Sequence, residues 1–449
     1  MDKVYYLSGN TIYTLDGEKV TEKLDTLKGT LYADLDKIYE TIVISFKRRR
    51  IWCDYLITGD GKCVFIKTKK LYIYNLSFAT VSGNIEELKE TLKHTDRPVM
   101  TVSSYAMHKF IDKCFNGLAE AYTDTFPNLY TMYNDLTGEN LDEEIRDAYT
   151  GGYNDFVQGK KMKKYAGVYV YDINSLYPYA SVAYPLPYGK PTMQKDIPEK
   201  TDDIFYFVSI NVLNGKIKDG YIPFVEVKCD YRYPLEGYVT EFYKNTVLTL
   251  SMYDFELLKK HYDVTYKVLD VIVFKAKKGI FDNYMRYYYE KKKTATGAER
   301  KYDKMMLNAL TGRIGQRHKM MGMRLHYKDN KFWYDYIETE RTKNLAYVAV
   351  AAAITSIGRY IIINAIQDNL EYCLYSDTDS LHSTKELDLP ISDEMGDYKI
   401  EHYYDEIKYY GRRNYIGREK DDYKVQMAAI TKEEQEVIRQ ELLQGKRTI

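Results

Sequence analysis

The stretch CLYSDTDSLHS, residues 373–383, places two aspartates between apolar and aromatic flanks. Its pattern predicts a β-hairpin with Asp377 and Asp379 on the same side of its tip. A solvated acidic turn is the simpler interpretation, but residues 373–375 and Leu381 embed the pair in apolar sequence. Two adjacent carboxylates repel one another unless a cation joins them. The hairpin therefore predicts a cation site at the end of a buried strand.

A third aspartate ends another hydrophobic strand much earlier in the chain. Residues 167–173, GVYVYDI, predict a buried strand with Asp172 near its end, and a tight turn follows through Pro178. A carboxylate at this point can bind Mg²⁺, and the backbone amides of the turn can hold phosphate oxygens. Taken alone, the stretch fits an ordinary strand end with a capping aspartate better.

A basic stripe lies between these two strands in the sequence. Arg300, Lys304 and Asn308 follow one another at a spacing of four residues, which places them on one face of a helix. Lys292 lies upstream on the same predicted segment. Such a face suits a triphosphate, although a solvated basic helix face is a common alternative.

The three patterns together serve one chemistry, nucleotidyl transfer. That reaction uses two metal ions about 4 Å apart, one activating the attacking hydroxyl and one neutralising the leaving group. It also uses cations that contact the triphosphate. The sequence therefore predicts that Asp172 and Asp377 bridge the metal ions and that the stripe from Lys292 to Lys304 clamps the phosphates.

Composition limits the class of protein. The chain has 449 residues with 65 basic and 65 acidic side chains, which argues against a histone-like binder. We expect no membrane span, since no stretch approaches roughly 20 apolar residues, and no signal peptide at the start. The five scattered cysteines are typical of a reducing compartment and argue against a zinc site. Most of the 49 tyrosines are interpreted as core and sheet residues, with base stacking as the alternative.

The order of predicted elements indicates an α+β chain. Short β-branched and aromatic runs predict strands within residues 1–80, and residues 84–120 predict helices. The strands expected there are TIYTL, ETIVISF, CVFIKT and LYIYNL. Further on, the sequence predicts strands in DIFYFVSINVL and GYIPFVEVK, and helices in SMYDFELLKKHY, in residues 281–310 with a break near Gly297, in residues 347–367 and in KEEQEVIRQELL.

Three motifs carry a resemblance to a known family. D-x-x-S-L-Y-P from Asp172, K-x-x-x-N-x-x-x-G from Lys304 and Y-x-D-T-D-S from Tyr375 resemble motifs A, B and C of family B DNA polymerases, in the family's order. The chain is most similar to the protein-primed branch of phages and linear plasmids, in which the hydroxyl of a terminal protein replaces an RNA primer. Residues 149–152, Tyr-Thr-Gly-Gly, resemble the Y-x-G-G template-binding loop of that branch. The resemblance covers about residues 100–430.

The resemblance implies a role for each matching residue. Asp172 and Asp377 are the implied metal ligands, Asp379 and Lys304 assist catalysis, and Tyr177 is the implied steric gate against a ribose 2′-hydroxyl. The implied nucleotide contacts are Ser175, Leu176, Tyr177, Lys292, Arg300, Lys304 and Asn308. The implied DNA contacts are Tyr149, Gly151, Gly152, Thr378, Arg413 and Tyr415.

The resemblance also implies the cofactors and partners. Two Mg²⁺ ions are implied, which Mn²⁺ can replace, together with template-primer DNA and deoxynucleoside triphosphates. A terminal protein is the implied primer, and no membrane is implied. A phage-encoded enzyme of this kind works in the cytoplasm of the bacterial host.

The implied architecture is a right-hand polymerase with palm, fingers and a short thumb, plus a small strand-rich N-terminal domain. The N-terminal domain is expected at residues 1–140 as a reduced exonuclease-like region, and the polymerase domain at residues 141–449. Within the latter, the expected parts are the palm at 165–190 and 345–410, a first insertion at 191–280, the fingers at 281–312, a second insertion at 313–345, and the thumb at 411–449.

The chain departs from the family pattern at several positions. Motif B carries Ala309 and Thr311 where the family usually has Ser and Tyr, and the K-x-Y motif that grips the primer appears as Arg413-Asn414-Tyr415. The family's exonuclease motifs have no clear match, because Asp16-Gly17-Glu18 reads equally as a hairpin turn and Ala79 stands where an aspartate is expected. We therefore expect no 3′–5′ exonuclease.

Two other functions remain as alternatives. A reverse transcriptase or RNA-copying enzyme has a similar palm, but such enzymes usually carry two adjacent aspartates rather than D-T-D-S. A non-catalytic nucleic-acid-binding relic is the other alternative, and the joint presence of Asp172, Asp377 and Lys304 argues against it.

Overall fold

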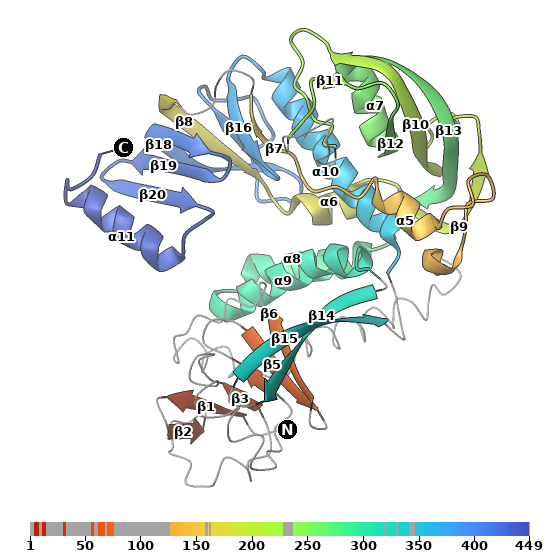
Figure 1. Cartoon of the computed structure of the whole chain (residues 1–449). Helices are drawn as coiled ribbons and strands as arrows, with labels where there is room; N and C mark the ends of the chain where they lie inside the picture. Colours follow the sequence, from red (N-terminus) through yellow and green to blue (C-terminus); the bar gives the residue numbers. More distant parts are fainter. Residues whose placement is uncertain are drawn as a thin grey trace. The chain divides into compact units, whose positions relative to one another are not determined.

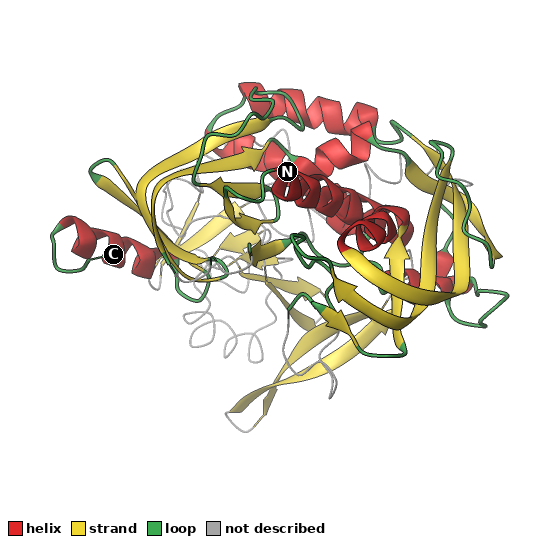
Figure 2. Cartoon of the chain, turned by 90° about the horizontal axis from the view of Figure 1, so that it is seen from above, coloured by secondary structure: helices red, strands yellow, loops and turns green. Residues whose placement is uncertain are grey.

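The chain divides into two units, each with its own sheet structure, in the computed structural model of Figure 1. Unit 1 comprises Met1–Thr123 and Tyr287–Ala346, and unit 2 comprises Asp124–Arg286 and Tyr347–Ile449. Runs of consecutive strands are interspersed with helices along the described residues, as predicted for the α+β class (Figure 2). The structure describes six short strands between residues 4 and 75, and then residues 126–157, 160, 163–227, 237–317, 319–328, 331–340 and 346–448.

Unit 1 contains an 8-stranded sheet in the order β15-β14-β6-β5-β4-β3-β1-β2. The runs TIYTL, CVFIKT and LYIYNL form strands as predicted, whereas ETIVISF and the helices expected at 84–120 lie outside the described residues. The strands are β1 (Val4–Ser8), β2 (Thr11–Thr14), β3 (Thr30–Tyr32), β4 (Tyr55–Ile57), β5 (Lys62–Lys67), β6 (Lys70–Asn75), β14 (Lys319–Lys328) and β15 (Lys331–Glu340).

The predicted helical region near residue 300 consists of two helices. Helix α8 (Asp282–Thr294) ends just before α9 (Gly297–Ile314) begins, which confirms the predicted break near Gly297. The break consists of Ala295 and Thr296, and Gly297 is the first residue of α9 rather than an interior one, where glycine is disfavoured. The antiparallel pair β14 and β15 follows within residues 313–345.

Unit 2 is built on a 7-stranded sheet in the order β20-β19-β18-β8-β17-β16-β7. The strand predicted from GVYVYDI is β8, and the predicted hairpin is β16 and β17. Helix α11 (Lys432–Leu443) packs on β20 at the end of the chain (Figures 1 and 2). The strands are β7 (Asn154–Phe156), β8 (Lys164–Ile173), β16 (Cys373–Asp377), β17 (Ser380–Ser383), β18 (Tyr398–Gly411), β19 (Asn414–Glu419) and β20 (Asp422–Met427).

A second sheet of unit 2 has the order β11-β10-β13-β9, and β12 pairs with β10. Its strands are β9 (Leu186–Gln194), β10 (Ile204–Ile217), β11 (Glu241–Phe242), β12 (Thr246–Ser251) and β13 (Tyr262–Lys277). The predicted strand GYIPFVEVK is wrong, because residues 220–225 form no strand and Glu226 makes an isolated bridge to Tyr238. Pro223 lacks an amide donor, and the adjacent side chains Phe224 and Val225 are both buried rather than alternating.

Helix α10 (Val348–Asp368) is the core helix of unit 2. It packs on α5 (Leu141–Arg146), α6 (Leu176–Ala183), α7 (Met252–His261), β9 and β12. It is long and apolar enough to cross a membrane by length and composition, so the expectation that no stretch reaches this limit was wrong. Most of its side chains are buried inside unit 2, which is the setting of a core helix.

Tyrosines fill much of the core, as the sequence predicted. Tyr375, Tyr404 and Tyr409 are fully buried in one cluster with Phe156, and Tyr165 and Tyr415 pack against it. Their rings meet in edge and tilted geometries, for example with 5.2 Å between the centroids of Phe156 and Tyr409. This aromatic layer supports the same strands, β8 and β16, that carry Asp172 and Asp377 at or near their ends.

Two buried histidines make unit 2 sensitive to acid. Burial lowers the pKa of His261 to about 4 and that of His382 to about 3, from an ordinary value of 6.5. The histidines of the unfolded chain keep their ordinary pKa and therefore bind protons more readily than those of the folded chain. The stability that the two neutral, buried histidines contribute is complete above pH 6.5 and is lost as the pH falls toward their pKa values in the folded state. We expect each histidine to cost about 2 kcal/mol of unfolding free energy at about pH 5.

Denaturant unfolding at about pH 7.5 and about pH 5 measures this loss. In His382→Asn the amide can keep the hydrogen bond that Nδ1 shares with the Tyr409 hydroxyl at 2.8 Å, and nothing there titrates. This variant should lose less stability on acidification than the parent chain. An equal loss in both proteins would contradict the assignment.

Candidate active site

A row of polar residues crosses five adjacent strands of the 7-stranded sheet. Asn154 pairs with Asp377, Asp377 with Ser380, Ser380 with Asp172, and Asp172 with Lys399. Residues directly opposite one another on paired strands point to the same face. The two predicted metal ligands therefore lie on one face, two strands apart, with about 10 Å between their Cα atoms.

The carboxylates of this row already face positive groups. Nζ of Lys399 lies 2.5 Å from Oδ1 of Asp172, and Nη2 of Arg413 lies 3.1 Å from Oδ1 of Asp377. Nδ2 of Asn154 donates to the same Asp377 oxygen at 2.9 Å. The Asp172 and Asp377 side chains are only 18% and 30% exposed, so these partners offset charge that water reaches poorly.

The donor set fits a hard divalent cation. Both side chains offer carboxylate oxygens, and Oδ1 of each carboxylate attracts a cationic group in this structure. Among the described residues there is no group of three or more His, Cys, Asp or Glu side chains that could hold a metal. Mg²⁺ needs no such group, because it is commonly held by one or two carboxylates with water and substrate phosphates.

The hairpin tip between β16 and β17 is strained. Thr378 has φ +61°, an unfavourable backbone conformation for a β-branched residue. Its amide donates to the carbonyl oxygen of Tyr153 at 2.7 Å, which helps to hold the turn. Asp379 belongs to this turn rather than to a strand, so Asp377 and Asp379 flank Thr378 at the tip of the predicted hairpin.

The segment after Asp172 is the start of a helix. The expected tight turn consists only of Asn174 and Ser175, with Ser175 at φ +58°, and α6 begins at Leu176. Pro178 is compatible with the first turn of a helix, where an amide has no intrahelical acceptor. The N-terminal amides of α6 therefore offer hydrogen-bond donors close in sequence to Asp172.

Tyr177 on α6 has a buried hydroxyl environment. Burial raises its pKa to about 12, while Arg359 lowers it and Asp379 raises it. The hydroxyl is therefore protonated at neutral pH. Its neighbours come from α10, from the hairpin tip and from the loop of residues 149–152.

The loop of residues 149–152 is attached to α10 and to the hairpin. Nη1 of Arg359 donates to the carbonyl oxygens of Thr150 and Gly151, both at 2.7 Å. The Gly152 backbone lies against Thr378. Tyr149, a predicted DNA contact, is half-buried, and burial raises its pKa.

The turn between β18 and β19 brings Arg413 to the row. Arg413 has φ +58°, and its amide donates to the Tyr375 hydroxyl at 2.9 Å. Its exposed side chain reaches Asp377. Tyr415 instead packs against the aromatic cluster, so the two residues of the predicted primer-gripping motif sit in different surroundings.

The basic stripe belongs to unit 1, whereas the aspartates belong to unit 2. Arg300, Lys304 and Asn308 are exposed on α9, while Lys292 lies on α8 and is half-buried. The predicted break near Gly297 therefore places Lys292 on a different helix from the other three residues. Nη1 of Arg300 donates to the Lys292 carbonyl oxygen at 2.9 Å, which links the two helices.

Three residues of the site, Lys399, Asn154 and Arg359, are not predicted by the sequence motifs. Arg359 had a readable signal, since it is the one charged residue in the apolar run of residues 348–367 and a buried charge needs a partner. Lys399 and Asn154 had none, because their positions depend on strand register.

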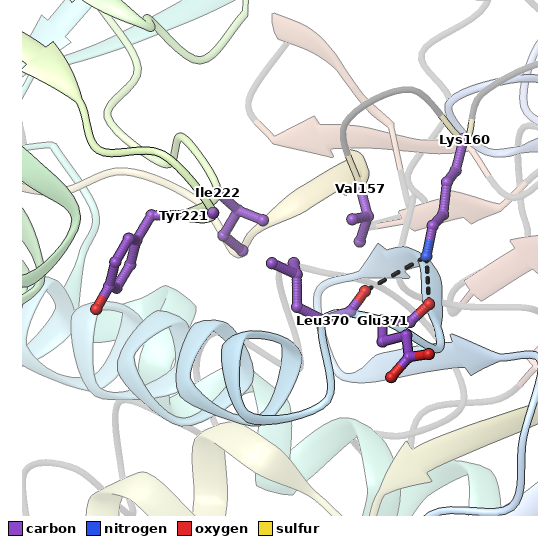
Figure 3. A pocket seen from close by; sticks show the side chains of 7 residues that line it. Val157, Lys160, Tyr221, Ile222, Leu370 and Glu371 are labelled. Atoms are coloured by element: carbon purple, nitrogen blue, oxygen red, sulfur yellow. Dashed lines mark hydrogen bonds between the residues drawn. The ribbon is translucent and has the colours of Figure 1, made fainter.

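A surface pocket lies beside β7 and β16, at the opposite ends of these strands from Asn154 and Asp377. The side chain of Lys160 lies on one side of this pocket (Figure 3). The other residues that line it are Val157, Gly220, Tyr221, Ile222, Leu370 and Glu371. Nζ of Lys160 donates to the carbonyl oxygens of Leu370, Glu371 and Cys373, at 3.3, 2.6 and 3.1 Å. The lysine thus serves the turn between α10 and β16, and the pocket offers no second set of metal ligands.

Removing the charge of Lys399 tests the cation site. A lysine beside Asp172 repels a divalent ion and competes for Oδ1, so Lys399→Met should bind Mn²⁺ roughly three- to tenfold more tightly. Electron paramagnetic resonance of free Mn²⁺ measures the affinity without any reaction. Lys399→Arg retains the charge and should bind Mn²⁺ like the parent chain. Weaker binding by Lys399→Met would contradict a metal at Asp172.

Comparison with known proteins gives consistent matches. The family of organellar and viral type B DNA polymerases matches residues 73–394. The DNA polymerase of Streptococcus phage Cp-1 is 27% identical over 434 residues, covering 82% of this chain and 76% of that protein. The DNA polymerase of Bacillus phage phi29 is 30% identical over 284 residues, covering 62% of this chain and 49% of that protein.

Solved structures show the same fold. The phi29 DNA polymerase complexed with primer-template DNA and incoming nucleotides has a TM-score of 0.76 to this chain, at 21% identity, and covers 97% of this chain and 94% of that one. At that identity the likeness establishes the fold alone. The family match spans more than half of the sequence. The chain therefore belongs to the type B DNA polymerases of the organellar and viral group.

Proposed function

We propose that this chain is a DNA-directed DNA polymerase whose metal ligands are Asp172 and Asp377. The observation that carries the proposal is the row in which both carboxylates share one face of the sheet. Two divalent ions bound there, Mg²⁺ or Mn²⁺, would supply the activation of the primer hydroxyl and the neutralisation of the leaving pyrophosphate. The family match supports this activity.

The residues around the metal ligands take the incoming nucleotide. The N-terminal amides of α6, at Ser175 and Leu176, are hydrogen-bond donors suited to phosphate oxygens. Tyr177 excludes a ribose 2′-hydroxyl by its bulk. On the sequence motif alone, we assign triphosphate contacts to Lys292, Arg300 and Lys304 and the nucleotide pocket to Asn308.

The DNA contacts form a second set. We assign the template to Tyr149, Gly151 and Gly152, and the primer end to Thr378, Arg413 and Tyr415. Exposed Arg413 suits a phosphate, because its guanidinium can leave Asp377 when DNA and metal arrive. The relatives crystallised with primer-template DNA support this class of partner.

Asp172→Asn and Asp377→Asn should each reduce nucleotide incorporation by roughly a thousandfold or more. Each change keeps the size of the side chain and removes the charge that holds the metal. Primer extension on a primed DNA circle measures the rate, and a gel-shift assay checks that DNA binding persists. Near-normal primer extension by either variant would contradict the assignment of both carboxylates as metal ligands.

Asp155→Asn is the matched control. Asp155 neighbours Asn154 on β7 but points to the opposite face, where it pairs with Arg412 at 2.8 Å. This variant should extend primers normally. A parallel reaction on an RNA template tests the reverse transcriptase alternative, and we expect no extension there.

We also propose protein-primed replication with strand displacement, on the resemblance alone. A terminal protein would present a hydroxyl in place of a primer end, and covalent labelling of such a protein by a nucleotide tests this step. The hairpin β14–β15 is the proposed displacement element. Deletion of residues 318–340 should spare gap filling and impair displacement of a downstream strand.

We propose that the chain lacks a 3′–5′ exonuclease. The acidic residues that could form one, Asp16, Glu18, Asp34 and Asp36, lie outside the described residues, as do Ala79 and the basic run 47–50. Incubation of a 3′-mismatched, end-labelled primer with Mg²⁺ and no nucleotides should leave its length unchanged. Shortening that persists in Asp377→Asn but disappears in Asp16→Ala/Glu18→Ala would reveal a working exonuclease.

A further inference from the structure

Two glycines from separate segments hold the ring of Tyr177. A Cβ at Gly358 of α10 would lie 3.0 Å from Cε1 and 3.3 Å from Cδ1 of that ring. A Cβ at Gly152 would lie 3.0 Å from the Tyr177 hydroxyl oxygen and 2.7 Å from Cγ2 of Thr378. The ring edge and the hydroxyl therefore both rest against backbone that has no room for a methyl group.

Gly358 lies in the interior of the longest described helix, where alanine is favoured over glycine. The contact with Tyr177 explains this choice, because only glycine lets the helix backbone approach the ring so closely. Gly151 provides the contrast within the loop, since a Cβ there would meet nothing within 4 Å.

The residue after Gly358 attaches the loop to the same helix. Nη1 of Arg359 donates to the carbonyl oxygens of Thr150 and Gly151 at 2.7 Å. Its Nε and Nη2 donate to the Asp254 carboxylate at 3.0 and 2.6 Å. Arg359 is 4% exposed and Asp254 is 3% exposed, so a buried ion pair fixes the loop that ends at Gly152.

Steric exclusion acts at van der Waals contact, so it requires a ring that cannot move. The ring of Tyr177 is limited by α10 on one side and by the Gly152 backbone at its hydroxyl end. Adjacent residues of α10 provide both limits: Gly358 touches the ring directly, and Arg359 fixes the loop. A rotation or shift of α10 would therefore move both limits together.

We propose that Gly358 and the Arg359–Asp254 pair position Tyr177 and thereby set how strongly the enzyme rejects ribonucleotides. The inference rests on the proposed role of Tyr177 as the gate against a 2′-hydroxyl. Gly358, Arg359 and Asp254 are positioning residues that act through Tyr177 and Gly152. The nucleotide discriminated against is one that carries a 2′-hydroxyl on the sugar.

The test is the ratio of kcat/KM for a deoxynucleotide to kcat/KM for the matching ribonucleotide, measured by primer extension with the full chain. Arg359→Lys retains the charge beside Asp254. Without the planar guanidinium, however, the lysine cannot donate hydrogen bonds to the carboxylate and to both carbonyl oxygens in the same arrangement. We expect it to lower the ratio by roughly tenfold. Gly358→Ala forces the ring to move by a few tenths of an ångström and should change the ratio by about fivefold or more.

Tyr177→Val separates this inference from the proposed function. If Tyr177→Val leaves the ratio unchanged, Tyr177 is not the gate and both ideas fail. If Tyr177→Val lowers the ratio while Arg359→Lys and Gly358→Ala keep the parent value, the gate stands and the positioning inference is overturned.

Double variants exclude a merely structural effect. In the Tyr177→Val background, Gly358→Ala should no longer change the ratio, because its effect passes through the ring. An unchanged effect in that background would contradict the inference. Asn364→Ala is the matched control on the same helix, because its side chain bonds only to Lys260 and to the Tyr360 carbonyl oxygen among the described residues, and it should keep the parent ratio. If Arg359→Lys does not fold by circular dichroism, Gly358→Ala alone decides the outcome.

Discussion

The antiparallel register of β8, β17 and β16 is the constraint on which the candidate site depends. Ser380 faces Asp377 on one side and Asp172 on the other, so three strands place two carboxylates on one face. A slip of one residue would turn either aspartate to the opposite face. The buried aromatic cluster farther along the same face of these strands opposes such a slip, because the slip would expose side chains such as Tyr375.

The positions of the charged side chains in the row depend on the same strand register. Carboxylates that face one another across a strand repel, and Lys399 and Arg413 bring positive charge to them from β18 and its turn. The strained residues Ser175, Thr378 and Arg413 all lie in turns around this row. Backbone strain of this kind persists only where the surrounding structure holds it, which links the precision of the site to the rigidity of the sheet.

Much of this arrangement could be predicted from local pattern. Apolar strand-like runs and turn residues predicted β8 and the hairpin, and the long apolar run of residues 347–367 predicted α10, since these elements depend on nearby sequence. Lys399 and Asn154 could not be predicted, because a residue's neighbour across a sheet depends on register between distant segments. The strand predicted at GYIPFVEVK was wrong, since burial of consecutive apolar side chains around His261 and Tyr262 outweighed strand propensity.

The Arg359–Asp254 pair has a consequence for exchanging parts between related polymerases. Asp254 lies on α7, within the segment assigned to the first insertion, whereas Arg359 lies on the core helix. A chimera that imports this insertion without an acidic residue at the same point would leave a buried guanidinium with only carbonyl partners. A functional exchange of the insertion must therefore keep both the carboxylate and the arginine, although the two residues are far apart in the gene.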